Sequence, residues 1–217
     1  MTEPTGAEIA QIVLNGYEAF AQMIEALDRK AWHTPTRCAG WEVCDAAGHV
    51  VGLASDSAAG TPGGRTADEQ AAALRDRSPQ DLATQLRAAV AGLHAFLELL
   101  DDAAWSGPSP VPDRTFAEAV VTLWFDLYVH DDDVRAALGI DHARGSTLTF
   151  AVIAVAASLT RLGWGPATLE LDDTPPIVIG GGGPKITGDP YQFVLVATGR
   201  ADAATMGVDP SVNIYAP

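Results

Sequence analysis

The sequence predicts a mainly α-helical protein, with a four-helix bundle followed by a small α+β domain. Two observations lead to this fold class: apolar residues recur at helical spacing in four long segments up to Leu138, and after about residue 165 the pattern changes to short β-type runs. With 217 residues, 47% of them hydrophobic, the chain is long enough to bury a substantial core. We expect domains over residues 1–144 and 145–217.

The first two helices are predicted from apolar periodicity and from punctuating residues. Gly6–Lys30 has apolar residues at three- and four-residue steps, which is typical of an amphipathic helix. A loop containing Pro35 and Gly40 follows, and the second helix is expected from about Val43 to Ala59. Asp45 lies near its start, where we expect it to act as a helix cap rather than as a ligand.

The third helix is predicted over Pro79–Leu100, because Ser78 can cap it and proline is favoured in the first turn. Before it, Asp68–Arg77 is expected to be a short helix or a mobile connection. The apolar residues of the third helix predict its core face. That face would hold Leu82, Leu86, Val90, Leu93, Phe96 and Leu97.

The fourth helix is predicted to start at Thr115, which has Glu118 three residues later in the pattern of a capping box. It should run to about Leu138 and end at Gly139, because glycine readily adopts the left-handed conformation of a C-cap.

The C-terminal part mixes helix and strand. Gly180–Gly183 lies between two of the expected strands, and without a following Lys-Ser/Thr pair it is no phosphate loop, so we interpret it as a hairpin connection. The expected elements are a helix over Ser146–Leu162, strands over Ala167–Leu171, Ile177–Ile179 and Lys185–Thr187, and a helix over Tyr191–Ala197.

Charge and composition exclude several classes of function. The formal net charge of −15 would repel phosphate backbones, so we expect no nucleic-acid partner. Cys38 and Cys44 match neither a zinc ribbon nor a redox pair. No segment is long and apolar enough to span a bilayer, and Met1-Thr2-Glu3-Pro4 lacks the start of a secretion signal. We therefore expect a cytoplasmic protein that is a monomer or a homodimer and has no membrane contact.

Three residues form a candidate metal site. Asp126 and His130 are four residues apart, so a carboxylate and an imidazole should project from the same face of the fourth helix. His49, late in the second helix, is the natural third donor. Two histidines, one carboxylate and an open fourth position are typical of catalytic zinc. The same spacing also fits an ordinary i,i+4 ion pair beside a packed histidine.

Three segments together resemble the mycothiol-dependent maleylpyruvate isomerase family. They are Pro35–His49, which contains the run Cys38-Ala39-Gly40-Trp41, then His130–Gly139, and finally Ile186–Tyr191 leading to Thr198-Gly199-Arg200. The resemblance implies a DinB-like four-helix bundle and a small C-terminal domain similar to sterol-carrier proteins. Both implied parts agree with the fold class predicted from the pattern.

The resemblance also implies a zinc or related divalent ion on His49, Asp126 and His130, with mycothiol as the thiol cofactor. A metal-held thiolate would add to a small electrophilic substrate, which is then isomerised or kept as an S-conjugate. The family pattern has Glu where this chain has Asp126, which shortens the reach by about 1.5 Å. Arg200 is the candidate to hold a substrate carboxylate, although a salt bridge or a helix cap would equally explain it.

For the other polar, cysteine and tryptophan residues near these segments, we expect structural roles rather than catalytic ones. Asp133 is expected to pair with Arg135 or to be solvated, although it could orient an imidazole. Cys38 and Trp41 are expected to pack, while His33, His94 and His142 are surface or packed residues. Two alternative functions remain: a metal-free ligand-binding or regulatory module, and a family member recruited to a biosynthetic pathway with a larger substrate.

Overall fold

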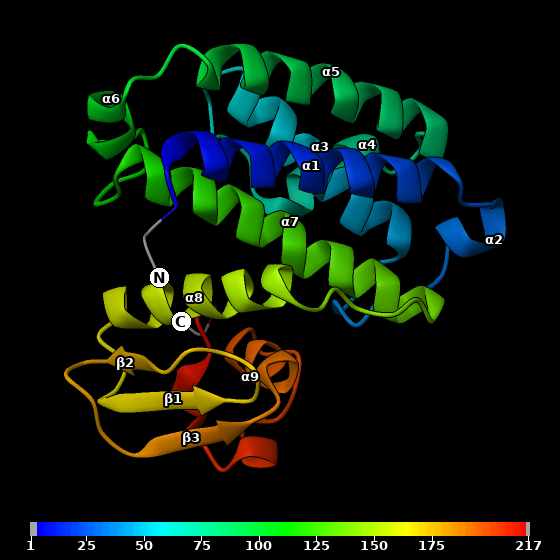
Figure 1. Ribbon diagram of the computed structural model, residues 1–217. Helices are drawn as coiled ribbons and strands as arrows, with labels where there is room; N and C mark the ends of the chain where they lie inside the picture. The colour runs from blue at the N-terminus through cyan, green and yellow to red at the C-terminus, as the bar shows by residue number, and fades with distance from the viewer. Residues whose placement is uncertain (1–3, 216–217) are drawn as a thin grey trace. The chain divides into compact units, whose positions relative to one another are not determined.

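The computed structural model describes residues 4–215, and it follows the predicted order of a helical part and a small α+β part (Figure 1). The segment used for the expectation about a secretion signal lies almost entirely outside these residues. The chain divides into two compact units between His142 and Ala143. Whether each unit folds independently, as the expected domains 1–144 and 145–217 would, stays a prediction.

The elements of the first unit are all helices. In chain order they are α1 (Gly6–Glu25), α2 (Arg29–Trp32), α3 (Val43–Ala58), α4 (Ala67–Leu74), α5 (Pro79–Leu97), α6 (Asp102–Ser106) and α7 (Phe116–Leu138).

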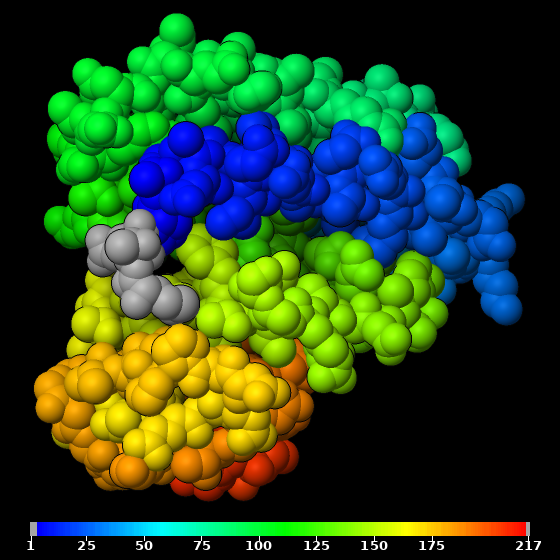
Figure 2. Space-filling view, viewed as in Figure 1, coloured from blue at the N-terminus to red at the C-terminus, as the bar shows by residue number. Residues whose placement is uncertain are grey.

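The four long helices α1, α3, α5 and α7 form the predicted bundle. Helices α1 and α3 each pack against both α5 and α7, so the four enclose one core. Figure 2 shows α1, in blue, lying along α5, in green, on one face of this unit. The largest side chains with almost no exposed surface in this core are Tyr17, Phe20, Ile24, Leu82 and Leu86.

Local capping signals place the helix ends where the sequence predicts them. The Thr115 side chain accepts from the Glu118 backbone N–H, and the Glu118 carboxylate accepts from the Thr115 N–H, so the capping box at the start of α7 is present. Gly139 ends α7 with a φ of 66°. Ser78 caps α5 through the N–H of Asp81.

Two expectations about the bundle are wrong. The first helix ends at Glu25 rather than Lys30, because Asp28 accepts from the N–H of Ala31 at 2.8 Å and starts the separate helix α2. Phe96 is not in the core: it is 47% exposed, and its ring contacts that of Phe116 on the outside of the bundle.

The segment after α3 is an ordered helix rather than a mobile connection. Thr66 and Glu69 form a capping box at the start of α4, and α4 packs closely on α3. Gly52 permits this approach, since a Cβ added there would lie 2.7 Å from Cβ of Gln70.

In the described residues, the second unit consists of two α-helices, two 3₁₀ turns and a small sheet. Its elements are α8 (Ser146–Arg161), β1 (Ala167–Leu171), β2 (Ile177–Ile179), β3 (Lys185–Gly188), α9 (Pro190–Ala197) and the 3₁₀ turns Ala203–Met206 and Pro210–Val212. The sheet order is β2-β1-β3, with β1 antiparallel to β2 and parallel to β3 (Figure 1).

This strand order shows that the hairpin expected at Gly180–Gly183 is wrong. Because β2 and β3 lie on opposite edges of β1, the glycines cross one end of β1 instead of turning back onto a neighbour. They pass so close to Pro166 that a Cβ on Gly183 would lie 2.5 Å from the Pro166 carbonyl oxygen. Close backbone approach is the reason for glycine at Gly183, and the positive φ angles of Gly180, Gly181 and Gly182 are the reason at the other three positions.

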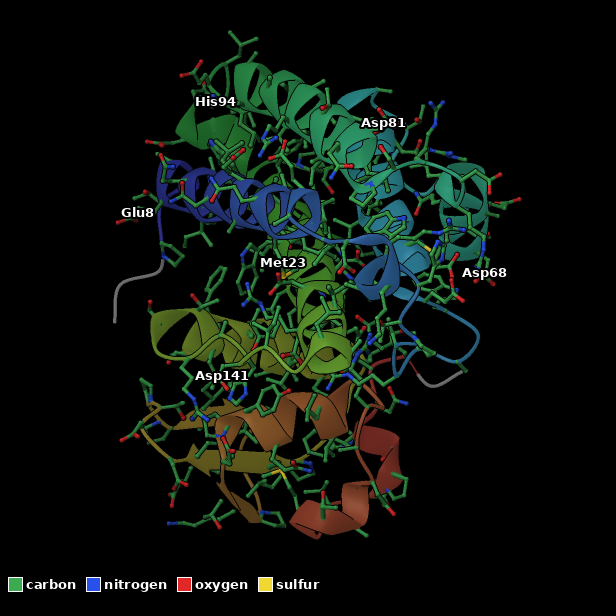
Figure 3. All side chains as sticks on the ribbon, turned by 90° about the vertical axis from the view of Figure 1, so that its right-hand side faces the viewer. Glu8, Met23, Asp68, Asp81, His94 and Asp141 are labelled. Atoms are coloured by element: carbon green, nitrogen blue, oxygen red, sulfur yellow. The ribbon has the colours of Figure 1, made fainter. Side chains whose placement is uncertain are left out.

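Exposed acidic side chains lie on several helices of the first unit. Figure 3 labels Glu8, Asp68 and Asp81, which are all exposed and come from three different helices. Within residues 4–215, no helix combines the length and the apolar character needed to cross a membrane.

Candidate metal centre

Helices α3 and α7 bring His49, Asp126 and His130 together. One nitrogen of each imidazole and one oxygen of the carboxylate all lie within 4.8 Å of one another. Nε2 of His49 is 3.1 Å from Asp126 Oδ2, and Nε2 of His130 is 4.0 Å from Asp126 Oδ1. The i,i+4 spacing on α7 and the packing of α3 against α7 therefore produce the convergence predicted from the sequence.

The second nitrogen of His49 is held by a buried residue that sequence reasoning missed. Nδ1 of His49 lies 2.8 Å from Oε1 of Gln70, which is on α4 and only 1% exposed. The amide of Gln70 donates in turn to Asp56 at 2.8 Å, and Asp56 is held by Arg65. An amide oxygen can only accept here, so Nδ1 carries the proton and Nε2 faces the other two donors.

The second nitrogen of His130 faces a buried carboxylate. Nδ1 lies 3.1 Å from Oδ2 of Asp133, within ion-pair distance although not in an aligned hydrogen bond. Asp133 has no exposed surface, and it also accepts from Arg37 at 2.6 Å and from the Cys38 thiol at 3.1 Å. The expectation that Asp133 pairs with Arg135 or is solvated is wrong.

Arg135 pairs instead with Asp131, one turn earlier on α7. Asp133 therefore does not pair with Arg135. It lies on the inner side of α7, where it forms an ion pair with Arg37 from the loop before α3. The loop and α7 are thereby joined through the carboxylate that contacts the His130 imidazole. Cys38, which was expected only to pack, is also a donor to this carboxylate.

Trp41 covers the two imidazoles. Its ring centroid is 5.5 Å from that of His49 and 5.6 Å from that of His130, and the two imidazole rings meet edge-on at 4.8 Å. The indole N–H donates to Asp68 at 3.0 Å, which fixes the ring. An aromatic cover of this kind reduces the access of water to the converging donors.

Burial and the charge of Asp126 together shift the pKa values of two neighbouring groups. Burial disfavours the His49 imidazolium, but the hydrogen bond to Asp126 and the charge of that carboxylate outweigh burial, so the pKa of His49 is raised. On α1, burial raises the pKa of Tyr17, and the charge of Asp126 adds to the effect. The phenol of Tyr17 therefore stays protonated beside the carboxylate.

The donor set fits a divalent ion of the zinc type. Two imidazoles and one carboxylate are the ligands of many catalytic zinc sites, and the three protein ligands leave a fourth position for a water or a substrate atom. Each imidazole also has the outer partner that usually orients a metal-bound histidine. Because the metal-facing atoms are Nε2 of both histidines, Gln70 and Asp133 occupy the nitrogens that would not bind the ion.

The remaining predicted residues lie elsewhere. Arg200 belongs to the second unit, where its guanidinium donates to the carbonyl of Thr198 at 3.1 Å and lies over the ring of Tyr215; contact with a substrate stays a prediction. Asp45 accepts from the N–H of Glu42 at 2.9 Å, as a capping residue of α3. Burial raises the pKa of Cys44 to about 11, which argues against a nucleophilic thiolate.

Comparison with known proteins identifies what the chain is similar to. Residues 13–135 match the family model described as the mycothiol maleylpyruvate isomerase N-terminal domain. The crystal structure of a mycothiol-dependent maleylpyruvate isomerase covers 97% of this chain and 98% of its own, with a TM-score of 0.65 and 19% identity. A histidine-to-alanine mutant of such an enzyme gives a TM-score of 0.63 at 18% identity, with the same coverage. This likeness confirms the predicted fold class. No curated protein sequence matches the chain.

Proposed function

The chain belongs to the mycothiol maleylpyruvate isomerase N-terminal domain family, and from this membership we propose that it is a divalent-metal enzyme that uses mycothiol to transform a small electrophile. Zinc is the metal that the donor set favours. Isomerisation is the proposed reaction, because the structurally similar crystal structures are of maleylpyruvate isomerases. S-conjugation of the same class of substrate is the variant of this reaction in which the carbon–sulfur bond persists.

One observation carries the proposal: His49, Asp126 and His130 converge, and each imidazole has a buried partner at its other nitrogen. These three residues would hold the ion. A divalent ion in this position supplies a positive charge that stabilises a thiolate, the form of a thiol that adds to electrophiles.

The protein's own groups prepare this site. Gln70 and Asp133 keep Nε2 of the two histidines directed inward, so no imidazole has to rotate before binding. Trp41 limits access of water on one side, and the buried phenol of Tyr17 stays protonated near Asp126 and so adds no second negative charge. Arg200 remains the proposed partner of a substrate carboxylate, because a guanidinium can bind it through two parallel hydrogen bonds.

A mycothiol-dependent assay tests this function. The zinc-loaded protein should convert maleylpyruvate, or a related unsaturated acid, only when mycothiol is present, and chelation should abolish the conversion. His130→Ala should be inactive, whereas His94→Ala, an exposed histidine on α5, should retain parental activity. Equal rates with and without mycothiol would contradict the proposed thiol chemistry, and equal rates with and without chelator would contradict the metal.

A metal-free ligand-binding module is the second candidate, and one observation favours it. His49 and Asp126 are already an ion pair at 3.1 Å, so part of the donor set can be satisfied without an ion. In this case zinc and chelator would change the thermal midpoint of the parent no more than that of His130→Ala protein. In the metal enzyme, zinc raises the midpoint because it binds the native state alone.

A further inference from the structure

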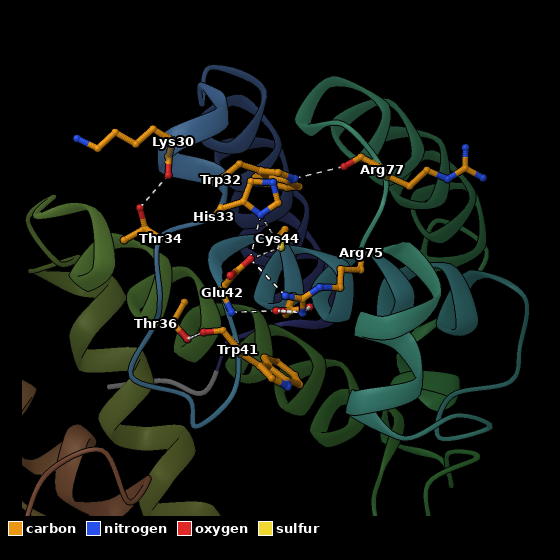
Figure 4. A network of polar contacts seen from close by, with 11 residues as sticks. Lys30, Trp32, His33, Thr34, Thr36, Trp41, Glu42, Cys44, Arg75 and Arg77 are labelled. Carbon is orange, nitrogen blue, oxygen red and sulfur yellow. Dashed lines mark hydrogen bonds and ion pairs between the residues drawn. The ribbon is translucent and has the colours of Figure 1, made fainter.

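A second group of metal-type donors lies where α2 ends and α3 begins. Nδ1 of His33 is 2.9 Å from Oε2 of Glu42, and Sγ of Cys44 is 3.6 Å from the same oxygen and 3.9 Å from Nδ1 of His33. Figure 4 shows the three side chains directed toward one another, with Trp41 directed away from them. This His33–Glu42–Cys44 cluster is therefore separate from the metal centre that Trp41 covers.

The backbone holds the cluster in place. His33 ends α2, Glu42 is the N-cap of α3, and Cys44 lies in the first turn of α3. The N–H of Val43 donates to the carbonyl of Thr34 at 3.0 Å, and Pro35 and Glu42 form a β-bridge. The two chain segments that carry the donors are thus joined immediately beside them. Ordering the donors for a ligand would need little further loss of backbone freedom.

The separations are within about 0.5 Å of those in a tetrahedral zinc site. With Zn–S near 2.3 Å and Zn–N and Zn–O near 2.1 Å, tetrahedral ligands lie about 3.4 Å apart for nitrogen and oxygen, and about 3.6 Å apart for sulfur and either. The observed 2.9, 3.6 and 3.9 Å surround these values. We propose that His33, Glu42 and Cys44 bind a divalent cation of the zinc type, as a second metal site of this protein.

Charge and access are consistent with such an ion. A thiolate and a carboxylate together balance the two positive charges, the thiol proton of Cys44 passes to solvent on binding, and the imidazole remains neutral. Arg75 contacts Glu42 at 3.3 Å but is also held by Asp45, so it keeps a partner if the ion displaces it. The side chains of His33 and Glu42 are 48% and 32% exposed, so solvent reaches the cluster from the side of these two residues.

Cobalt substitution tests the site directly, because a thiolate bound to Co²⁺ gives charge-transfer absorption that histidine and carboxylate ligands do not give. The titration uses His130→Ala protein, so that the first metal centre does not contribute. We expect the absorption to appear with one equivalent of Co²⁺ and to disappear when Zn²⁺ is added. This result is independent of the proposed enzyme function, since it requires neither mycothiol nor the first site.

Two further variants identify the ligands. Cys44→Ala should abolish the absorption, and Cys38→Ala, which removes the other cysteine, should leave it unchanged. His33→Gln changes a half-exposed side chain, so it should fold as the parent does, and it should weaken Co²⁺ binding by at least about tenfold. No thiolate absorption in the folded parent, or its loss in Cys38→Ala instead of Cys44→Ala, would overturn the proposal. In that case the cluster is only an ion-pair network.

Discussion

The two imidazoles of the metal centre differ in what holds their second nitrogen. His49 contacts a neutral amide, Gln70, whereas His130 contacts a carboxylate, Asp133, which is itself neutralised by Arg37. A carboxylate partner makes an imidazole a more basic ligand than an amide partner does. We therefore expect His130 to be the stronger ligand, with Gln70 acting mainly to orient His49.

Replacing Gln70 tests this orienting effect. Gln70→Leu keeps a similar volume but removes the acceptor at Nδ1 of His49, so the affinity for zinc should fall roughly 10- to 100-fold. Competition with a chromophoric chelator, carried out in Cys44→Ala protein so that the proposed second site does not contribute, measures the change. Gln85→Leu on α5, where the Gln85 amide donates to Ser55 at 3.3 Å, is the control and should bind zinc as the parent does. Equal affinities for the two variants would show that Gln70 does not orient the ligand.

The raised pKa of His49 predicts how the stability of metal-free protein depends on pH. A histidine whose pKa is higher in the folded state stabilises the fold fully below its ordinary value of 6.5, and this contribution is lost as pH rises through the raised pKa. In Asp126→Asn the charge and the ionic hydrogen bond of Asp126 are absent, while burial still lowers the pKa of His49 and Gln70 and Asp68 still raise it, so the stabilisation at low pH should be smaller than in the parent.

Urea unfolding in the presence of a chelator, on both sides of pH 6.5, measures this difference. Asp76→Asn removes an exposed carboxylate away from the site, and it should reproduce the parental pH dependence. If Asp126→Asn also reproduced it, the pair between His49 and Asp126 would not contribute to stability.

Sequence spacing could predict the inward-facing donors but not their outer partners. Asp126 and His130 are one helical turn apart, which is a local signal. Gln70 is 21 residues from His49, and its contact depends on how α4 packs on α3, which no periodicity reveals. The only available signal for Gln70 was a polar residue beside Ala71 and Leu74 on the apolar face of a short helix.

At the scale of the elements, the close packing of α4 on α3 is needed for the candidate metal centre, because it brings Gln70 to His49. Gly48 and Gly52 both face α4, and a Cβ on Gly52 would lie 2.7 Å from Cβ of Gln70. That neighbour is the start of a side chain and not its flexible end, so it can move only if α4 moves. Glycine inside α3 is thus required by close packing, although it lowers helix propensity.

Two glycine-to-alanine changes should have opposite effects on stability. Gly52→Ala should destabilise the fold by about 1–3 kcal/mol, because overpacking exceeds the gain in helix propensity of about 1 kcal/mol. Gly92→Ala in α5 meets only ordinary contact, at 3.8 Å from Cβ of Ala58, and should stabilise by up to about 1 kcal/mol. Denaturant unfolding compares the two variants. Stabilisation by both would mean that α4 is free to shift.

Helix ends were predictable where the signal is local, and strand order was not. The capping box at Thr115 and the C-cap at Gly139 each depend on residues within one turn. The strands β2 and β3 have only three and four residues, and their placement on opposite edges of β1 is a non-local choice. A glycine run between two strands is equally compatible with a hairpin and with a crossover.

At the scale of the whole molecule, residue periodicity indicates the two-part organisation, and three sequence segments that span both parts indicate the family. The candidate metal ligands all lie in the helical unit. The net charge of −15 is compatible with binding a neutral thiol sugar and a metal cation, and it disfavours polyanionic partners. We infer that the bundle is a scaffold for a divalent metal held by His49, Asp126 and His130.

Metal content measured by elemental analysis tests that claim most directly. In Cys44→Ala protein, which lacks the proposed second site, we expect about one equivalent of zinc after reconstitution and dialysis, and in Cys44→Ala/His130→Ala protein almost none. Circular dichroism establishes that both variants are folded. Absence of metal from folded Cys44→Ala protein, or an equal metal content in both proteins, would contradict the account.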